Sequence, residues 1–250
     1  MSGCPVDHGS KAPPASEVCC PVSKEAGAAF AEAAVGAEVR GANSELKYSQ
    51  EVSRRVIVHV ALQGADVVAC VQPAPGQRMP LSTRRLTSTI PKGEDPGPKH
   101  QVADDPNWTY PSEQMFFNAM KRKGYSAREE DIPMVVAIHN TVNEMAWKKV
   151  LGWEHMHAEK CPNPRLAKFS GRPKDLSPKA RLKTLFGYSR PFDRHDWVVD
   201  RCGTDVRYII DFYNGKAEPG RPISMHLDAR PALDSVGSLF DRVRRFWGFA

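Results

Sequence analysis

The chain has 250 residues, of which 41% are hydrophobic, and its 35 basic and 29 acidic side chains give a net charge of +6. This length suits one domain with an extension or two small domains, and no apolar run approaches the roughly 18 residues of a membrane-spanning helix. We expect no secretory signal, since a basic segment followed by an apolar one is missing, and no arginine-rich presequence, since the first arginine is Arg40.

The positive charge is local. Residues 1–47 hold four basic and six acidic side chains, whereas residues 160–195 hold ten basic and two acidic ones, a net +8. The basic segment is interrupted by prolines and matches no recognised nucleic-acid-binding module, so we expect no nucleic-acid partner. An anionic small ligand or an anionic lipid surface fits this segment better.

Aromatic residues are scarce in the first 100 positions, where only Phe30 and Tyr48 occur. A segment rich in Ala, Gly, Pro and Ser buries little apolar surface, which predicts a largely disordered arm over residues 1–50. Within or after it we expect a short helix at 26–39 and, at 56–62, either a strand or an insertion of no fixed structure. Residues 71–107 are interpreted as a proline-rich connection.

Regular structure is predicted from Trp108 onwards. Ser112 can cap a helix that Gly124 ends, and Pro133 suits the first turn of a longer helix that reaches Trp153. Apolar residues recur at helical spacing along this second helix.

The C-terminal half predicts a sheet and two more helices. We expect a short helix at 178–186, strands at 196–200 and 206–213 joined by Cys202-Gly203-Thr204, a third strand at 224–228, and a final amphipathic helix over 233–247. The fold class is therefore α+β: helices packed with a small antiparallel sheet, preceded by the disordered arm. We divide the chain into an arm and insert (residues 1–80) and a catalytic domain (residues 81–250).

The six cysteines form no Cys-x-x-Cys pair, which argues against a zinc knuckle or a thioredoxin-type site, and a chain of this length does not need disulfides. Cys4, Cys20 and Cys161 each precede a proline, and the first two continue as Cys-Pro-Val. An extended, exposed thiol is a good ligand for haem iron, so the pattern resembles a haem-regulatory motif. Exposed thiols of no consequence are the alternative.

His139 shares a helical stripe with apolar residues, and two interpretations of it stay open. It is either a hydrogen-bonded core histidine or, with Asn140, Asn143 and Glu144 around it, a neutral imidazole that holds the metal of a flat apolar macrocycle. His155 and His157 are two residues apart and do not share a helix face.

Four ordered motifs carry a resemblance to a known family. They begin at Trp108-Thr109-Tyr110-Pro111, at Ile138-His139-Asn140, at Pro191-Phe192-Asp193-Arg194-His195-Asp196-Trp197, continued by Arg201-Cys202-Gly203-Thr204, and at Leu227-Asp228-Ala229-Arg230-Pro231. With these motifs, residues 71–250 resemble the holocytochrome c synthases, also called cytochrome c haem lyases. Residues 54–71 have no counterpart in that resemblance.

The resemblance implies an enzyme of the mitochondrial intermembrane space, peripheral on the inner membrane. Its members attach haem b, bound as substrate, to apocytochrome c by joining the haem vinyl groups to the thiols of a Cys-x-x-Cys-His segment. This chain has no such segment, so it would be the lyase and not the cytochrome. A haem-binding chaperone or sensor without covalent chemistry is the alternative.

The resemblance also implies a site. His139 would be the catalytic residue and the axial ligand of the haem iron, with Asn140, Asn143 and Glu144 orienting it. The other candidates for contact with haem are aromatic or apolar wall residues, basic residues for the propionates, and the two arm cysteines: Trp108, Tyr110, Pro111, Met115, Trp147, Trp153, Arg194, His195, Arg201, Cys4 and Cys20. We expect the final helix, with Phe246, Trp247 and Phe249, to contact the membrane surface.

Overall fold

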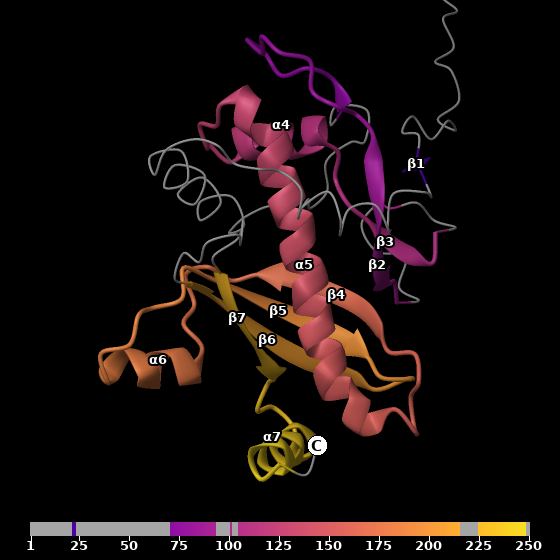
Figure 1. Cartoon of the computed structure of the whole chain (residues 1–250), viewed down its shortest axis with the longest axis vertical. Helices are drawn as coiled ribbons and strands as arrows, with labels where there is room; N and C mark the ends of the chain where they lie inside the picture. Colours follow the sequence, from indigo (N-terminus) through magenta and orange to yellow (C-terminus); the bar gives the residue numbers. More distant parts are fainter. Residues whose placement is uncertain (1–21, 24–70, 94–100, 102–104, 216–224, 249–250) are drawn as a thin grey trace, which may run out of the picture.

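A single long helix, α5 (Ile132–Glu154), organises the computed structural model, which describes residues 22–23, 71–93, 101, 105–215 and 225–248. Helix α4 (Glu113–Arg122) and a three-stranded sheet lie beside its N-terminal half, and a four-stranded sheet packs on its C-terminal half (Figure 1). The helix expected at 26–39, the strand expected at 56–62 and nearly all of the expected arm lie outside the described residues.

The three-stranded sheet has the order β1 (Val22–Ser23), β2 (Arg85–Pro91), β3 (Asn107–Thr109). Strand β1 is parallel to β2, and β3 is antiparallel to it. The proline-rich connection expected over 71–107 contains β2 and the first residue of β3, and neither strand was expected. The apolar pattern missed β2 because Arg85 is buried there, where its guanidinium donates to the carbonyl oxygens of Thr109 and Tyr110 at 3.0 Å each.

The four-stranded sheet is antiparallel throughout, in the order β4 (Arg165–Gly171), β5 (Asp193–Asp200), β6 (Asp205–Asn214), β7 (Met225–Pro231). The α+β class and the strands expected at 196–200, 206–213 and 224–228 are confirmed, with longer bounds. Strand β4 was not expected. It is an edge strand in which Leu166 is the one fully buried side chain, so its sequence shows no alternation of buried and exposed residues.

Side-chain caps set the helix starts. The Ser112 hydroxyl accepts from the Met115 amide at the start of α4, and Ser177 and Ser235 do the same for α6 (Pro178–Leu185) and α7 (Val236–Phe246). The expected helices over 112–124, 133–153 and 178–186 are confirmed. The last helix begins at Val236 and not at Leu233, because its cap is Ser235.

Two apolar clusters share α5. The first joins the C-terminal half of α5 to the four-stranded sheet, and the second joins its first two turns to α4. Segment 72–80 also contacts α4: Asn118 donates to the Gln72 carbonyl at 2.8 Å, and Gln77 bonds to Gln114 at 2.9 Å. The residues just before the expected boundary at 80 thus pack on a helix that lies after it, and the domain division itself stays a prediction.

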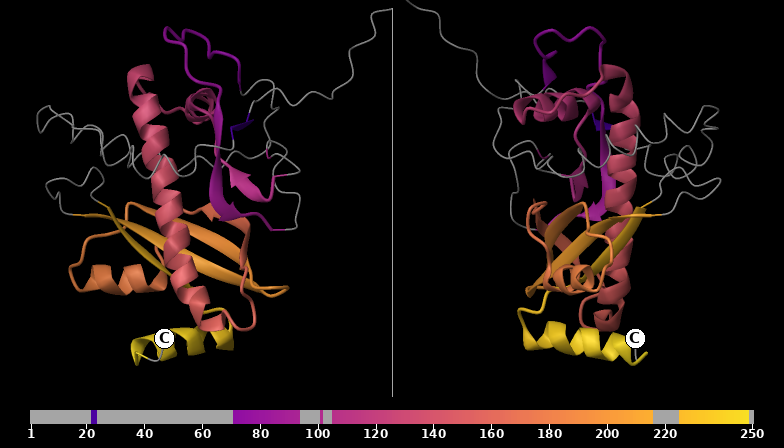
Figure 2. Two further views of the ribbon diagram at one scale, coloured as in Figure 1. Left: turned by 45° about the vertical axis from the view of Figure 1, so that its right-hand side comes forward. Right: turned by 90° about the vertical axis from the view of Figure 1, so that its left-hand side faces the viewer.

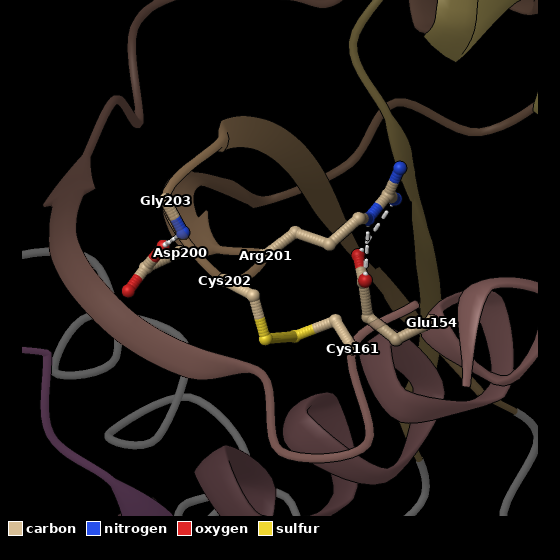
Figure 3. Close-up of a disulfide and its surroundings, with 6 residues drawn as sticks. All are labelled: Glu154, Cys161, Asp200, Arg201, Cys202 and Gly203. Carbon is tan, nitrogen blue, oxygen red and sulfur yellow. Dashed lines mark hydrogen bonds and ion pairs between the residues drawn. A yellow bond between two sulfur atoms is a disulfide. The ribbon is translucent and has the colours of Figure 1, made fainter. Parts of the chain in front are cut away.

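A disulfide between Cys161 and Cys202 bonds the turn between β5 and β6 to the loop that follows α5 and the short 3-10 helix His155–His157 (Figure 3). Cys202 and Gly203 both have positive φ, 48° and 91°, as the two central residues of a type I′ hairpin turn require. A chain of this length does not need disulfides, but this one has a disulfide, and the interpretation of Cys161 as an exposed thiol was wrong: Cys161 is 2% exposed and covalently paired. Sequence spacing could not reveal the pair, since 41 residues separate the two cysteines.

In the part of the chain that the structure describes, none of the helices combines the length and the apolarity needed to cross a bilayer.

Candidate haem site

His139 lies on α5 at the junction of the two apolar clusters. The second cluster includes Val135 and Val136 on one side of it, and the first begins with Val142 on the other. The rings of Phe116 and Tyr110 approach the imidazole edge-on, with centroids 5.4 and 6.5 Å away. His139 is therefore a half-buried imidazole among aromatic rings.

The imidazole is neutral at physiological pH. Burial, with a smaller contribution from the nearby His195, lowers the pKa of His139 to about 4. The Asn143 amide nitrogen lies 3.1 Å from His139 Nε2 and donates to the His139 carbonyl at 3.0 Å. Because that amide can only donate, Nε2 presents a lone pair, and a neutral ring nitrogen with a lone pair is the form that binds iron.

A carboxylate one turn further along α5 connects the site to the small sheet. Glu144 accepts from the Tyr110 hydroxyl at 2.9 Å, from the Thr89 amide at 3.1 Å and from the Thr89 hydroxyl. Burial and the Glu144 charge raise the pKa of Tyr110 well above its usual value, so the phenol stays protonated as a donor. These bonds fix the Tyr110 ring beside His139.

Asn140 is the one buried amide of the site whose side-chain oxygen has no hydrogen-bond partner among the described residues. Its backbone carbonyl accepts from the Tyr110 hydroxyl at 3.4 Å. Since an unsatisfied buried acceptor costs free energy, Asn140 is a residue with capacity for a further hydrogen bond in the region of Tyr110 and His139.

The four-stranded sheet contributes His195. Its ring lies against Phe212, at a centroid distance of 5.1 Å, and its Nε2 is 3.0 Å from an oxygen of the buried Asp193. Residues 193, 195, 197 and 199 share one face of β5, where Trp197 and Val199 belong to the cluster that packs on α5. His195 and His139 therefore approach each other from the sheet and from the helix.

Arg194 points away from this site. Adjacent residues of a strand face opposite sides of the sheet, so the Arg194 side chain lies on the face turned away from α5. There its guanidinium makes two hydrogen bonds to Asp196, at 2.8 and 2.9 Å. The structure does not bring Arg194 and His139 together.

Arg201 and Trp153 lie at the other end of α5. Glu154 accepts two bonds from Arg201, at 2.7 and 2.9 Å (Figure 3). It accepts a third from the Tyr208 hydroxyl at 2.5 Å. Trp153 donates to the Ala229 carbonyl at 2.8 Å. Fifteen residues of helix separate His139 from Glu154, roughly 22 Å along the axis at 1.5 Å per residue.

The remaining candidates are mostly core residues. Trp147, two turns beyond His139, and Trp108 belong to the first cluster, and the Trp108 indole donates to the Leu166 carbonyl at 2.9 Å. Met115 is fully buried on α4, next to Phe116, and Pro111 is half-buried after Tyr110. Cys4 and Cys20 lie outside the described residues.

Three residues near the site were missed from the sequence. Phe116 and Asp193 stand inside the recognised motifs, but the strand was expected to begin at 196, so the contact of Asp193 with His195 was not foreseen. Thr89 had no signal in the sequence, because only the pairing of β2 beside α5 brings it to Glu144.

The described residues contain no group of three or more His, Cys, Asp or Glu side chains arranged to hold a bare metal ion. What the site offers is the neutral His139 imidazole among aromatic rings, with polar groups along the same helix and His195 on the facing sheet. Such a set suits one axial bond to a metal that brings its own equatorial ligands, as haem does.

Sequence comparison connects this site with known proteins. The family model described as cytochrome c/c1 heme lyase matches residues 1–246. The chain is 47% identical over 181 residues to the holocytochrome c-type synthase of Bos taurus and 46% identical over 182 residues to that of Homo sapiens. It is 35% identical over 272 residues to the holocytochrome-c synthase of Saccharomyces cerevisiae, an alignment that covers 98% of this chain and 86% of that protein.

The bovine and human alignments each cover 70% of this chain but only 62% and 64% of those relatives, so the chain spans less than two thirds of their length. No solved structure matches the chain. The resemblance inferred from the four motifs is confirmed by the family match over nearly the whole sequence. The chain belongs to the cytochrome c/c1 heme lyase family.

Proposed function

We propose that this protein attaches haem b covalently to apocytochrome c in the mitochondrial intermembrane space, at the surface of the inner membrane. The observation that carries the proposal is the neutral His139 between Tyr110 and Phe116, in a chain of the cytochrome c/c1 heme lyase family. Haem and cytochrome c as substrates are inferred from the names of the relatives, and the binding place for haem is inferred from the geometry around His139.

In this mechanism His139 provides one axial bond to the iron of the haem substrate. The histidine of the apocytochrome Cys-x-x-Cys-His segment takes the opposite axial position, which brings the two neighbouring thiols to the two vinyl groups. Catalysis then rests largely on proximity and orientation. Each thiol adds across one vinyl group: a sulfur–carbon bond forms, the C=C double bond becomes single, and the thiol proton ends on the other vinyl carbon.

The surrounding residues hold His139 and the haem. Asn143 keeps the imidazole in the tautomer with its lone pair on Nε2, and it has to release that nitrogen when iron binds. Tyr110, held by Glu144, and Phe116 provide aromatic surface, while Asn140 has an unused acceptor. His195 is our candidate for a polar contact with haem.

Arg194 and Arg201 have a different part in this proposal. Arg194 lies on the far face of the sheet, and Arg201 lies at the opposite end of α5, where it is paired with Glu154. We assign both to stability and not to the propionates of a haem on His139. Cys4 and Cys20 stay candidates for accessory haem binding by the arm.

The proposal is tested by co-expressing the chain with apocytochrome c. Haem that stays on the cytochrome through denaturing electrophoresis reports thioether formation. We expect the wild type to give it and His139→Gly to lose it, with partial recovery on added imidazole. His155→Gly is the matched control, because His155 is an exposed histidine just after the end of α5.

Two outcomes would overturn the proposal. Full haem attachment by His139→Gly would remove His139 from the mechanism. Reversible haem binding by the wild type, with no haem left on the cytochrome after denaturation, would identify the chain as a haem chaperone or sensor instead.

A further inference from the structure

Exposed apolar side chains are concentrated on two short helices and the residues beside them. Of the 16 large hydrophobic residues that are exposed in the described chain, 11 belong to α6, α7 and their flanks. They are Leu182, Leu185, Phe186, Tyr188, Leu233, Val236, Leu239, Phe240, Val243, Phe246 and Trp247. Contiguous exposed apolar residues of this kind mark a surface that binds something apolar.

Helix α6 carries these residues as a stripe. Leu182, Leu185 and Phe186 recur at helical spacing, with exposed fractions of 57%, 80% and 71%. Basic residues border the stripe on both sides, Arg181 on one and Lys179 and Lys183 on the other. The opposite face is held to the sheet, where the capping residue Ser177 donates to the buried Asp211 at 2.6 Å and Ala180 is buried.

Helix α7 repeats this arrangement. Val236, Leu239, Phe240, Val243, Phe246 and Trp247 form one exposed stripe, bordered by Arg242 and Arg244. The other face binds the protein: Asp241 contacts His157 at 2.9 Å, and Arg245 donates to the Gly152 carbonyl at 2.9 Å while its guanidinium lies 4.3 Å from the centre of the Trp153 ring. The stripe is therefore exposed on a helix that is firmly attached.

Both helices lie toward the same end of the molecule. In Figure 1 and in both views of Figure 2, α6 and α7 are found beyond or beside the four-stranded sheet, at the end of α5 that is opposite to α4. Within the two helices the exposed charges are basic, because their one acidic residue, Asp241, is 5% exposed and paired. The exposed Asp234, just before α7, is paired with Arg207. An apolar stripe between basic residues is the pattern of helices that lie in the surface of an anionic bilayer.

We propose that α6 and α7 together form the membrane-binding surface of this protein and that its partner there is a bilayer rich in anionic lipid. The inference rests on the proposed location at the inner membrane and deepens it, because it names a second helix, α6, and the lipid class. It also sets the height of the haem site. His139 lies roughly 20 Å along α5 from the α7 end, at 1.5 Å per residue, so the site stands above the lipid surface, where a soluble apocytochrome can reach it.

Vesicle flotation of the full-length protein tests this. We expect tighter partition onto phosphatidylcholine vesicles that contain one third phosphatidylglycerol than onto phosphatidylcholine alone. The double variants Leu185→Ser with Phe186→Ser, and Phe240→Ser with Phe246→Ser, should each lower the partition coefficient about tenfold or more, since each removes two large apolar contacts. Arg181→Ser with Lys183→Ser, which removes a basic residue on each side of the α6 stripe, should lower it about tenfold at low salt, and high salt should remove that difference.

Matched controls remove exposed apolar and basic side chains from other parts of the molecule. Met79→Ser with Met134→Ser removes two exposed apolar side chains of other segments, and Lys148→Ser with Lys149→Ser removes two exposed charges of α5. Neither pair should change partition more than about twofold. Equal losses from the controls, unchanged partition of the α6 and α7 variants, or no vesicle binding by the wild type would each overturn the inference.

Sedimentation distinguishes a second copy of the chain as the occupant. If the wild type is a dimer without lipid, and the α7 variant is a monomer with unchanged partition onto vesicles, the stripes are a dimer interface and the inference is wrong.

A haem-attachment assay with purified apocytochrome c in lipid-free solution separates the membrane proposal from the proposed function. The α6 and α7 variants should keep haem attachment. A wild type that binds anionic vesicles through both helices but attaches no haem would overturn the proposed function alone.

Discussion

The two ends of α5 are built on different principles. At the C-terminal end, Glu154 accepts three bonds from Arg201 and Tyr208, Asp241 pairs with His157, and a disulfide joins the neighbouring loop to the β5–β6 turn. At the N-terminal end, around His139, the polar groups are half-buried and Asn140 has an unused acceptor. The C-terminal end is densely bonded and covalently linked, whereas the His139 end has an unused buried acceptor that our proposal leaves for the substrate.

Such a division is physically reasonable. Buried polar groups that are all satisfied rigidify their surroundings, whereas a binding site needs groups whose partners arrive with the ligand. The large expected effects on stability therefore belong to the Glu154 end, and the pH-dependent effects belong to the His139 end.

The largest effect should come from breaking the ion pair at the C-terminal end. Arg201→Ala leaves the 3% exposed Glu154 without its charged partner, and we expect the free energy of unfolding to fall by about 3–5 kcal/mol. Urea denaturation measures it. The control Arg128→Ala breaks exposed ion pairs with Glu130 and Asp131 and should cost at most about 1 kcal/mol. Similar losses in both variants would contradict the view that the Glu154 end is the rigid one.

Removing the disulfide should have the next largest effect. Cys161→Ser with Cys202→Ser opens a loop closed across 41 residues, and the expected loss of unfolding free energy is about 2–4 kcal/mol. The comparison is made by urea denaturation against the wild type with and without a reductant. Reductant should lower the stability of the wild type and leave the variant unchanged. A wild type insensitive to reductant would show that this bond does not stabilise the C-terminal end of α5.

At the other end, His139 should make stability depend on pH. Its pKa of about 4 in the folded chain lies below the unfolded value of 6.5, so between these values the unfolded state binds more protons. Above pH 6.5 the histidine is neutral in both states, so the folded protein loses no stability to it. As pH drops toward 4, the free energy of unfolding should fall by up to about 3 kcal/mol. The measurement is the difference in unfolding free energy between the wild type and His139→Gln, taken above and well below the unfolded pKa. A pH-independent difference would place the imidazole in a more polar environment than the structure does.

The smallest effect is expected from Tyr110→Phe. The variant keeps the ring beside His139 and removes one of the donors to Glu144, whose bonds from Thr89 remain, so we expect a loss of about 1–2 kcal/mol. The exposed Tyr188→Phe is the control and should change stability by less than about 0.5 kcal/mol. If Tyr110→Phe changes the free energy of unfolding as little as Tyr188→Phe does, the bond to Glu144 does not hold the aromatic ring at the site.

Sequence patterns alone determined the helices and most of the sheet. A helix start depends only on neighbouring residues, as at Ser112, Pro133 and Ser177. The 3.6-residue spacing of apolar side chains along α5 is equally local. The motifs around His139 identified the family for the same reason, since a motif is read along the chain. The sequence did not predict strand β2, because its buried arginine obscures the two-residue alternation, or strand β4, because an edge strand is mostly exposed.

Only the tertiary structure decided which candidates share a site. Arg194 and His195 are adjacent in sequence but lie on opposite faces of β5, and the helix axis places Arg201 and Trp153 a long way from His139. The pairing of Cys161 with Cys202 and the exposure of the α6 and α7 stripes likewise depend on partners distant in the chain. Local hydrogen bonds and periodicity follow from nearby residues, whereas burial, pairing and the shifted pKa of His139 arise from contacts that form when the whole chain packs.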